Sequence, residues 1–392
     1  KGAICRRSFR RPRPPADMSS MLMNQPIVID NGSGSIKAGF SATNKPKFTL
    51  STYVGRPKYK KVMAEERKEP YVGDEAKKLA GVLKLNYPIK HGVIQHWDDM
   101  ESIWSHVYTQ LGVQKDEHPV LITEAPLNPR KNREKMAEVF FETFNVPAFY
   151  VQIPPILSLY ASGRTTGLVL DSGEGVTHAV PVFEGFALPH AMQRIDVAGR
   201  DVTEYLQRLL RKAGYPFHTT AELEVVRQIK EKVCFTSYDY KKDSREKEDE
   251  PNAEHIYPLP DGKWIGIAQE KFRAPEVMFN PELIGLEYPG VHECLVNAVK
   301  ASDLDIRRTL YRNIVLAGGT TTNQGFPDRL LNSVRQLSPR DTKIRIYAPT
   351  DRIESSWIGG AILGGLATFK KMWVERKEYR EAGKSILYRR TF

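Results

Sequence analysis

The sequence contains few cysteines and no long apolar segment. Its 392 residues include three cysteines, Cys5, Cys234 and Cys294, whose spacing matches neither a disulfide framework nor a zinc-binding motif. This usage favours a reducing compartment, and we expect a cytoplasmic protein. Since no segment approaches the roughly 20 consecutive apolar residues of a membrane-spanning helix, we expect no membrane insertion.

The common nucleotide-binding fingerprints are also missing. The sequence has no GxxxxGK[ST] loop. It has a GxG turn at residues 32–34, but the third glycine of GxGxxG is absent and a strand rather than a helix is expected to follow. The net charge of +11 indicates either a charged, solvated surface or an acidic partner. Basic residues are not interleaved with aromatic ones, which argues against nucleic-acid binding.

The length and the 41% hydrophobic content are sufficient for two domains. Residues 1–24 are expected to lie outside them as a disordered basic extension, because residues 1–15 contain six Lys or Arg, three Pro and little to bury. The extension lacks the apolar region of a secretory signal. We interpret it as an upstream start or a gene-model error, with Met18, Met21 and Met23 as alternative starts. A mitochondrial presequence is the other interpretation.

Two segments share one pattern: an apolar strand, an aspartate, a small polar residue, a glycine, any residue and a second glycine. Asp30 and Asp171 occupy the aspartate position and stand 141 residues apart. Either turn alone could be an ordinary hairpin, because turns of this composition are common. The repetition instead predicts two similar domains that face one ligand.

This pattern suits a phosphate and a metal ion. Glycines allow a sharp turn, and the amides of such a turn can form an anion-binding nest. Aspartates prefer hard cations such as Mg²⁺, so we predict that Asp30 and Asp171 bind the metal through water. The predicted phosphate-binding residues are Gly32, Ser33, Gly34, Lys37, Gly173, Glu174, Gly175 and Val176.

A third apolar strand with a Gly pair follows at residues 313–321, and the three pieces together resemble the ATPase pattern shared by actins, hexokinases and chaperones. From about Gln25 to Phe392 the chain resembles actins, as in PLNPRKNRE at 126–134, FFETFNVP at 140–147 and WIGG at 357–360. The segments RK at 130–131, AEVFF at 137–141, RRTL at 307–310 and FKKMWV at 369–374 resemble the centractin branch, the actin-related proteins of the dynactin complex.

The resemblance implies an α/β fold, with two similar domains of two subdomains each around a nucleotide cleft. Residues 25–161 and 353–392 would form the first domain, with 52–73 as its small outer subdomain, and residues 162–352 the second. The implied cofactors are ATP or ADP with Mg²⁺. The implied nucleoside-binding residues are Gly199, Arg227, Lys230, Glu231, Gly318, Gly319 and Asn323.

Several positions depart from the family pattern. Pro154 stands where actins have the glutamine that positions the attacking water, and proline has neither a side-chain amide nor an N–H. Gln152 lies about 6–7 Å back along the strand and is a weak candidate to replace it. Glu174 replaces an aspartate, while His178 remains available to hold water. We therefore expect nucleotide binding with slow or absent hydrolysis.

Asn323 stands at a tyrosine position and Ile353 at a lysine position, which puts base stacking in question. The family resemblance implies self-association into a filament, through a loop at residues 59–70 among others. It further implies partners among dynactin subunits and actin capping protein, an indirect link to dynein, and a place in the cytoskeleton. The alternatives are a divergent conventional actin with an ATP-driven polymerisation cycle and a nuclear subunit of a chromatin-remodelling complex.

Overall fold

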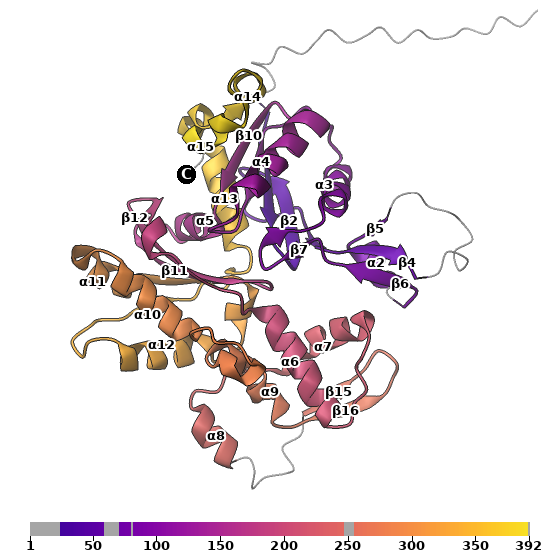
Figure 1. Ribbon diagram of the computed structural model, residues 1–392, viewed down its shortest axis with the longest axis vertical. Coiled ribbons are helices and arrows are strands. Elements are labelled where there is room, and N and C mark those ends of the chain that lie inside the picture. The colour runs from indigo at the N-terminus through magenta and orange to yellow at the C-terminus, as the bar shows by residue number, and fades with distance from the viewer. Residues whose placement is uncertain (1–23, 59–69, 80, 247–254, 391–392) are drawn as a thin grey trace, which may run out of the picture.

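The computed structural model describes residues 24–58, 70–79, 81–246 and 255–390 (Figure 1). Three predicted features lie outside the described residues: residues 1–23 of the extension predicted at residues 1–24, most of the charged loop at residues 59–70, and Cys5. Two large mixed sheets form the centres of two lobes, which we call the first and the second lobe. The mixed α/β architecture expected from the sequence is confirmed. The domain boundaries stay a prediction.

The first lobe is built on a six-stranded sheet in the order β19-β10-β9-β1-β2-β3. Strands β1, β9 and β10 run parallel, and their nearly continuous apolar sequences suit strands that are covered on both faces. The strands are β1 (Ile27–Asn31), β2 (Ser35–Phe40), β3 (Phe48–Ser51), β9 (Val120–Thr123), β10 (Ala148–Gln152) and β19 (Val374–Glu375).

The second lobe repeats this plan with the order β13-β12-β11-β17-β18, and β14 pairs with β12. In each lobe an antiparallel hairpin lies beside parallel strands: β1–β2 beside β9, and β11–β12 beside β17. The strands are β11 (Gly167–Ser172), β12 (Thr177–Phe183), β13 (Phe186–Ala187), β14 (Gln193–Ile195), β17 (Ile314–Ala317) and β18 (Ile346–Tyr347).

Smaller sheets extend both lobes. The sheet β5-β4-β6 projects from the first lobe, at the right of Figure 1, and the β15–β16 hairpin lies low in the second. Their strands are β4 (Val54–Pro57), β5 (Tyr71–Val72), β6 (Leu83–Asn86), β15 (His255–Pro258) and β16 (Trp264–Ile267), and a further hairpin joins β7 (Ile89–Lys90) to β8 (Val93–Ile94).

Helices cover the sheets of both lobes. The first lobe carries α2 (Asp74–Lys78), α3 (Trp97–Leu111), α4 (Arg130–Glu138), α5 (Pro154–Ala161), α13 (Ser355–Gly365), α14 (Arg376–Ala382) and α15 (Leu387–Arg390). The second carries α6 (Gly199–Lys212), α7 (Thr220–Val233), α8 (Tyr240–Glu246), α9 (Glu270–Arg273), α10 (Val291–Ala301), α11 (Leu304–Arg312) and α12 (Phe326–Leu337).

Helices α5 and α13 cross where the chain passes between the lobes. Their backbones approach so closely that a Cβ on Gly359 would overlap the carbonyl oxygen of Leu157. The hydroxyls of Ser158 and Ser356 lie 3.0 Å apart, and Ser355 Oγ donates to Ser158 Oγ at 3.0 Å. Small residues therefore allow the two helices to pack backbone against backbone.

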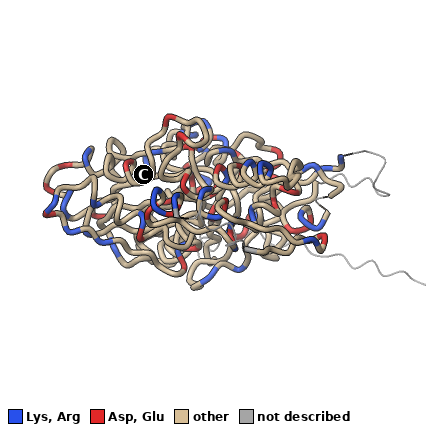
Figure 2. Tube along the Cα trace, turned by 90° about the horizontal axis from the view of Figure 1, so that it is seen from below, with Lys and Arg blue, Asp and Glu red and all other residues tan. Residues whose placement is uncertain are grey.

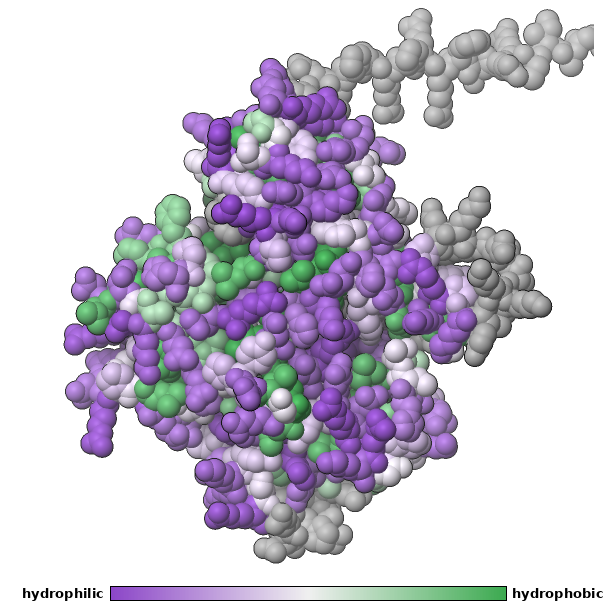
Figure 3. Space-filling view, viewed as in Figure 1, coloured by the Kyte–Doolittle hydropathy of each residue, from purple (hydrophilic) through white to green (hydrophobic). Residues whose placement is uncertain are grey.

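Surface features match the composition. Lys and Arg are spread through the molecule, with Asp and Glu among them (Figure 2). Apolar side chains gather along the boundary between the lobes on the face shown in Figure 3. Cys234 and Cys294 are buried, unpaired thiols. Within the described ranges, no helix combines the length and the apolar character that crossing a bilayer requires.

Candidate functional site

The first predicted phosphate turn joins β1 to β2 at the carboxyl end of β1. Asp30 and Lys37 are directly opposite in this hairpin, so the Lys37 ammonium donates to Asp30 Oδ2 at 2.9 Å. Thr123, at the end of the parallel neighbour β9, donates to Asp30 Oδ1 at 2.9 Å and accepts from Asn31 N at 2.8 Å. The carboxylate is therefore held in one orientation at the edge of the sheet.

The second turn joins β11 to β12 in the same way. Asp171 and His178 are directly opposite in this hairpin. Gly318 follows the parallel neighbour β17 with φ +85°, and a Cβ there would overlap the Ser172 backbone and the Asp171 carboxylate. Burial, with the nearby Asp30 carboxylate, raises the pKa of Asp171 to about 7, and Lys37 partly offsets this. Two carboxyl groups, one from each lobe, thus line the same cleft and affect each other's charge.

The two turns touch. A Cβ on Gly175 would lie 2.7 Å from Ser33 Oγ, and one on Gly34 would overlap the Glu174 carboxylate. His91, held at φ +48°, bonds through Nδ1 to the Gly175 carbonyl oxygen at 2.9 Å. Arg194 donates to the His91 carbonyl oxygen at 2.8 Å. The floor of the cleft is therefore a contact between the lobes.

Helices α6 and α7 form the side wall of the cleft. The Lys230 ammonium donates to the Gly199 carbonyl oxygen at 2.8 Å, and burial lowers the pKa of Lys230. Arg227 donates to Glu224, with Nε at 2.8 Å, and to Glu231 at 2.8 Å. The Arg227 guanidinium is therefore fixed by two carboxylates, and hydrogen bonding to Glu224 is the main cause of its raised pKa.

The side chain of Asn323 holds parts of the cleft wall together. Its amide nitrogen donates to the Cys234 carbonyl oxygen at 3.1 Å, and its amide oxygen accepts from Thr236 Oγ1 at 2.8 Å. Ile353 also lines the cleft and is 47% exposed. Since both ends of the Asn323 amide are occupied by the chain itself, this residue shapes the wall of the cleft.

The cleft has a volume of about 750 Å³. It brings together Asp30, Asp171, His178, Pro154, and all the residues predicted to bind phosphate or nucleoside. Gln152 is the exception among the predicted site residues: its amide oxygen accepts from Ile153 N at 2.9 Å, and it is absent from the described lining. Its side chain folds onto its own backbone instead of toward the cleft.

Pro154 and His178 both line the cleft. Pro154 is the first residue of α5, where its missing N–H leaves no helical hydrogen bond unmade. Burial lowers the pKa of His178 to about 3, with a further contribution from Arg194, so the imidazole is neutral near pH 7. Its backbone hydrogen bond with Pro126 uses Nδ1 as the donor, because Nε2 is buried without a partner among the described residues. Nε2 is therefore an acceptor.

These residues fit a phosphorylated ligand with a hydrated divalent cation. The described residues contain no group of three or more His, Cys, Asp or Glu side chains that could hold a metal by themselves. Asp30 and Asp171 supply two carboxylates, which suits a cation that keeps most of its waters and shares oxygens with a phosphate. The unpartnered His178 Nε2 is a ready acceptor for a water molecule.

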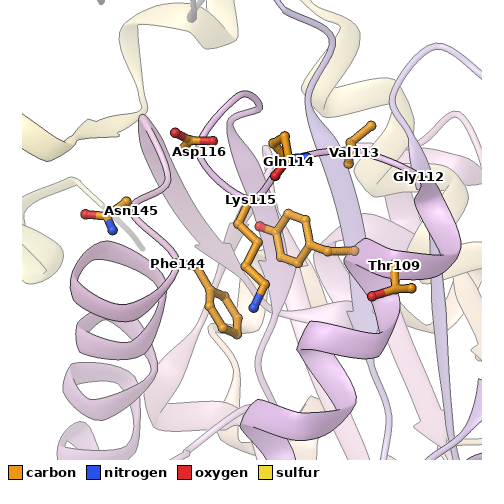
Figure 4. Close-up of a pocket in the computed structure, with 9 residues that line it drawn as sticks. Thr109, Gly112, Val113, Gln114, Lys115, Asp116, Phe144 and Asn145 are labelled. Carbon is orange, nitrogen blue, oxygen red and sulfur yellow. The ribbon is translucent and has the colours of Figure 1, made fainter. Parts of the chain in front are cut away.

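A second, open cavity of about 450 Å³ lies in the first lobe, beyond the end of α3 (Figure 4). Lys115 places its ammonium 4.4 Å from the centre of the Phe144 ring and donates to Ser105 at 2.9 Å. Asp116 and Asn145 lie on its rim. None of the predicted site residues lines it.

Some residues of the cleft were missed by sequence reasoning. Thr320 donates to the Gly173 carbonyl oxygen at 2.6 Å, and its place directly after the Gly pair was the available signal. His91 and Gly92 reach the floor from the β7–β8 turn, where Gly92 N donates to Ser33 Oγ at 3.2 Å. No local pattern distinguished this His-Gly pair from an ordinary turn.

Comparisons with known proteins agree on one family. The profile of the Actin family matches residues 21–392. The "Actin-like protein" of Neurospora crassa is 55% identical over 370 residues, which cover 93% of this chain and 97% of the relative.

Proposed function

Because the chain belongs to the actin family, we propose that it binds ATP or ADP with Mg²⁺ between its lobes. The observation that carries this proposal is the contact of two glycine turns from two lobes, each behind an aspartate. The bound nucleotide would supply the phosphate charge that links the turns. Gly32 to Gly34 and Gly173 to Gly175 would offer backbone amides to phosphate, and Asp30 and Asp171 would hold the hydrated cation.

We further propose that hydrolysis is slow or absent. Pro154 lines the cleft and offers no group that can orient water, and the Gln152 amide oxygen is engaged by Ile153 N. His178 Nε2 could accept one hydrogen bond from a water molecule, but one acceptor fixes its position less well than two groups would. The nucleotide would then act as a structural link between the lobes.

We propose that the protein forms a short filament and acts as a centractin-like scaffold of dynactin in the cytoplasm and cytoskeleton. The similarity to a fungal actin-like protein along nearly its whole length supports an actin-related filament protein. The centractin-like segments at residues 130–131, 137–141, 307–310 and 369–374 support the finer assignment. Dynactin subunits, actin capping protein and, indirectly, dynein would be its partners.

The test is the fate of bound nucleotide. Purified protein is incubated with ATP and Mg²⁺ under polymerising conditions, and the released nucleotide is identified by chromatography over several hours. We expect intact ATP from the natural protein. Pro154→Gln should form ADP at least about tenfold faster, because a positioned polar group commonly contributes more than that to catalysis. Pro154→Ala, which removes the proline at the same position without adding an amide, is the matched control.

ADP formed at an actin-like rate by the natural protein would refute slow hydrolysis and favour the alternative of a divergent conventional actin. Failure to retain any adenine nucleotide would refute the binding proposal. Tight binding without self-association, measured by sedimentation, would favour a subunit of a non-filamentous complex, such as a nuclear actin-related protein.

A further inference from the structure

Glu174 crosses from one lobe to the other at the floor of the cleft. It belongs to the second-lobe turn, yet its carboxylate lies against Gly34 of the first-lobe turn, so closely that a Cβ on Gly34 would overlap it. The backbone of Glu174 is fixed, because its carbonyl oxygen accepts from Arg200 N at 2.9 Å. A carboxyl group therefore lies against the turn whose amides are suited to bind an anion.

The cations around this carboxylate already have partners. Lys37 donates to Asp30 at 2.9 Å, Lys230 donates to the Gly199 carbonyl oxygen, and Arg227 is held by Glu224 and Glu231. Asp30 and Asp171 add further carboxyl groups to the same cleft. Lys230 keeps its positive charge, because a carbonyl oxygen is neutral, and it is attracted to the Glu174 and Glu231 carboxylates. Since Lys37 and Arg227 are held by carboxylates as well, an additional negative charge brought to Gly34 meets a lining in which carboxyl groups already offset the cations.

The end of the glutamate side chain makes the closest part of this contact: Glu174 Oε2 would overlap a Cβ on Gly34, whereas Glu174 Cβ would lie 2.9 Å from it. An aspartate at position 174 would carry its carboxylate one carbon–carbon bond, about 1.5 Å, less far from its backbone. A shorter side chain would withdraw the carboxylate from Gly34 and leave more room there for a further phosphate group. The longer side chain occupies that region with both volume and charge.

We propose that Glu174 makes the cleft select a nucleoside diphosphate over the corresponding triphosphate. This inference rests on the proposed nucleotide binding and concerns the specificity of that same site. A triphosphate brings one more phosphoryl group and one more negative charge than a diphosphate, and the Glu174 carboxylate opposes both at Gly34. Glu174 is thus a specificity-determining residue of the cleft.

The experiment measures dissociation constants for ADP and for a non-hydrolysable ATP analogue by calorimetry, at one fixed free Mg²⁺ concentration. Three variants are compared with the natural protein. Glu174→Gln keeps the shape and removes the charge, and Glu174→Asp keeps the charge but shortens the reach. Glu184→Gln changes an exposed glutamate in the β12–β13 turn, outside the cleft lining, and is the matched control.

We expect the natural protein to bind ADP more tightly than the triphosphate analogue. Glu174→Gln should shift the ratio of the two constants toward the triphosphate by at least about tenfold, since like charges at contact distance interact by more than this in a partly buried site. Glu174→Asp should shift it in the same direction by less. Glu184→Gln should leave both constants unchanged, and thermal unfolding checks that each variant folds.

Three results would overturn the inference. A ratio that stays within twofold in Glu174→Gln and Glu174→Asp would mean that the carboxylate does not discriminate. A selective loss of triphosphate binding in Glu174→Gln would mean that the carboxylate helps to hold the cation. If the natural protein bound neither nucleotide, the proposed function would fall, and the specificity inference with it, whereas the first two results leave nucleotide binding intact.

Discussion

The crossing of α5 and α13 gives the sharpest prediction about stability. Alanine at position 359 would place its Cβ more than an ångström inside the 3.0 Å limit that real Cβ atoms respect, and the atom it meets is the backbone carbonyl oxygen of Leu157. Because a carbonyl cannot rotate away as a side chain can, the two helices must separate. Overpacking of this kind costs about 1–3 kcal/mol, and helix propensity returns at most about 1 kcal/mol.

We therefore expect Gly359→Ala to lower the free energy of unfolding by about 1–2 kcal/mol. The matched control is Gly365→Ala on the same helix, where the nearest atoms to a new Cβ belong to Ala42, at 3.9 and 4.0 Å, and where we expect no loss. Both variants are compared with the natural protein by urea denaturation followed by circular dichroism. Equal stability of the two variants would refute the packing argument, because both replace a glycine of α13 by alanine and they differ in the room available for the new Cβ.

Two further predictions concern buried charges. The pKa of Asp171 in the folded state, about 7, lies above its ordinary value of 3.8, so the folded state binds more protons between these values and loses stability as the pH rises from about 4 to 7. In nucleotide-free protein Asp171→Asn should remove this loss, on the order of 2–4 kcal/mol, and identical pH profiles of thermal unfolding would contradict it. Arg329→Met should lower the free energy of unfolding by about 3 kcal/mol, because the buried Glu276 would lose the guanidinium that donates to it at 2.9 Å. Burial raises the pKa of Glu276, so its charge depends on this partner. Adding Glu276→Gln should recover most of the lost stability in urea denaturation.

Much of the fold followed from local patterns. The apolar residues between 96 and 108 recur at helical spacing, and the structure has α3 there, which continues to Leu111 and ends at Gly112 with φ 74°. The sequence of residues 128–144, with a proline in the first turn, favours one continuous helix, but the structure divides it into α4 and a π-helical turn at Val139–Thr143. That turn packs Phe140 against Trp104 of α3, with their ring centroids 5.0 Å apart, within a cluster of aromatic rings. Such packing is set by partners distant in sequence and has no local signature.

The candidate site, too, was predictable from local patterns only in part. The two turns and their aspartates were found because their pattern repeats in the sequence, and the actin-like fold expected from the resemblance is confirmed by the family match. The contact of His91 with Gly175 was missed, since it joins residues of different lobes and depends on a left-handed backbone at His91. The contact of the Glu174 side chain with Gly34 could not be predicted either, because it depends on how the second lobe lies against the first.

The backbone contact between α5 and α13 also has a mechanical consequence. The backbones of α5 and α13 are so close at Leu157 and Gly359 that a rotation of the lobes would pivot at this crossing. The far ends of the lobes meet through Lys77 and Glu224, 3.5 Å apart, and through Arg200, 4.1 Å from the ring of Tyr87. A rotation moves the points farthest from its pivot most, so a slight tilt of these helices would produce the largest displacement at these two contacts. A pair of fluorophores attached near these contacts, one on each lobe, would therefore report the angle between the lobes.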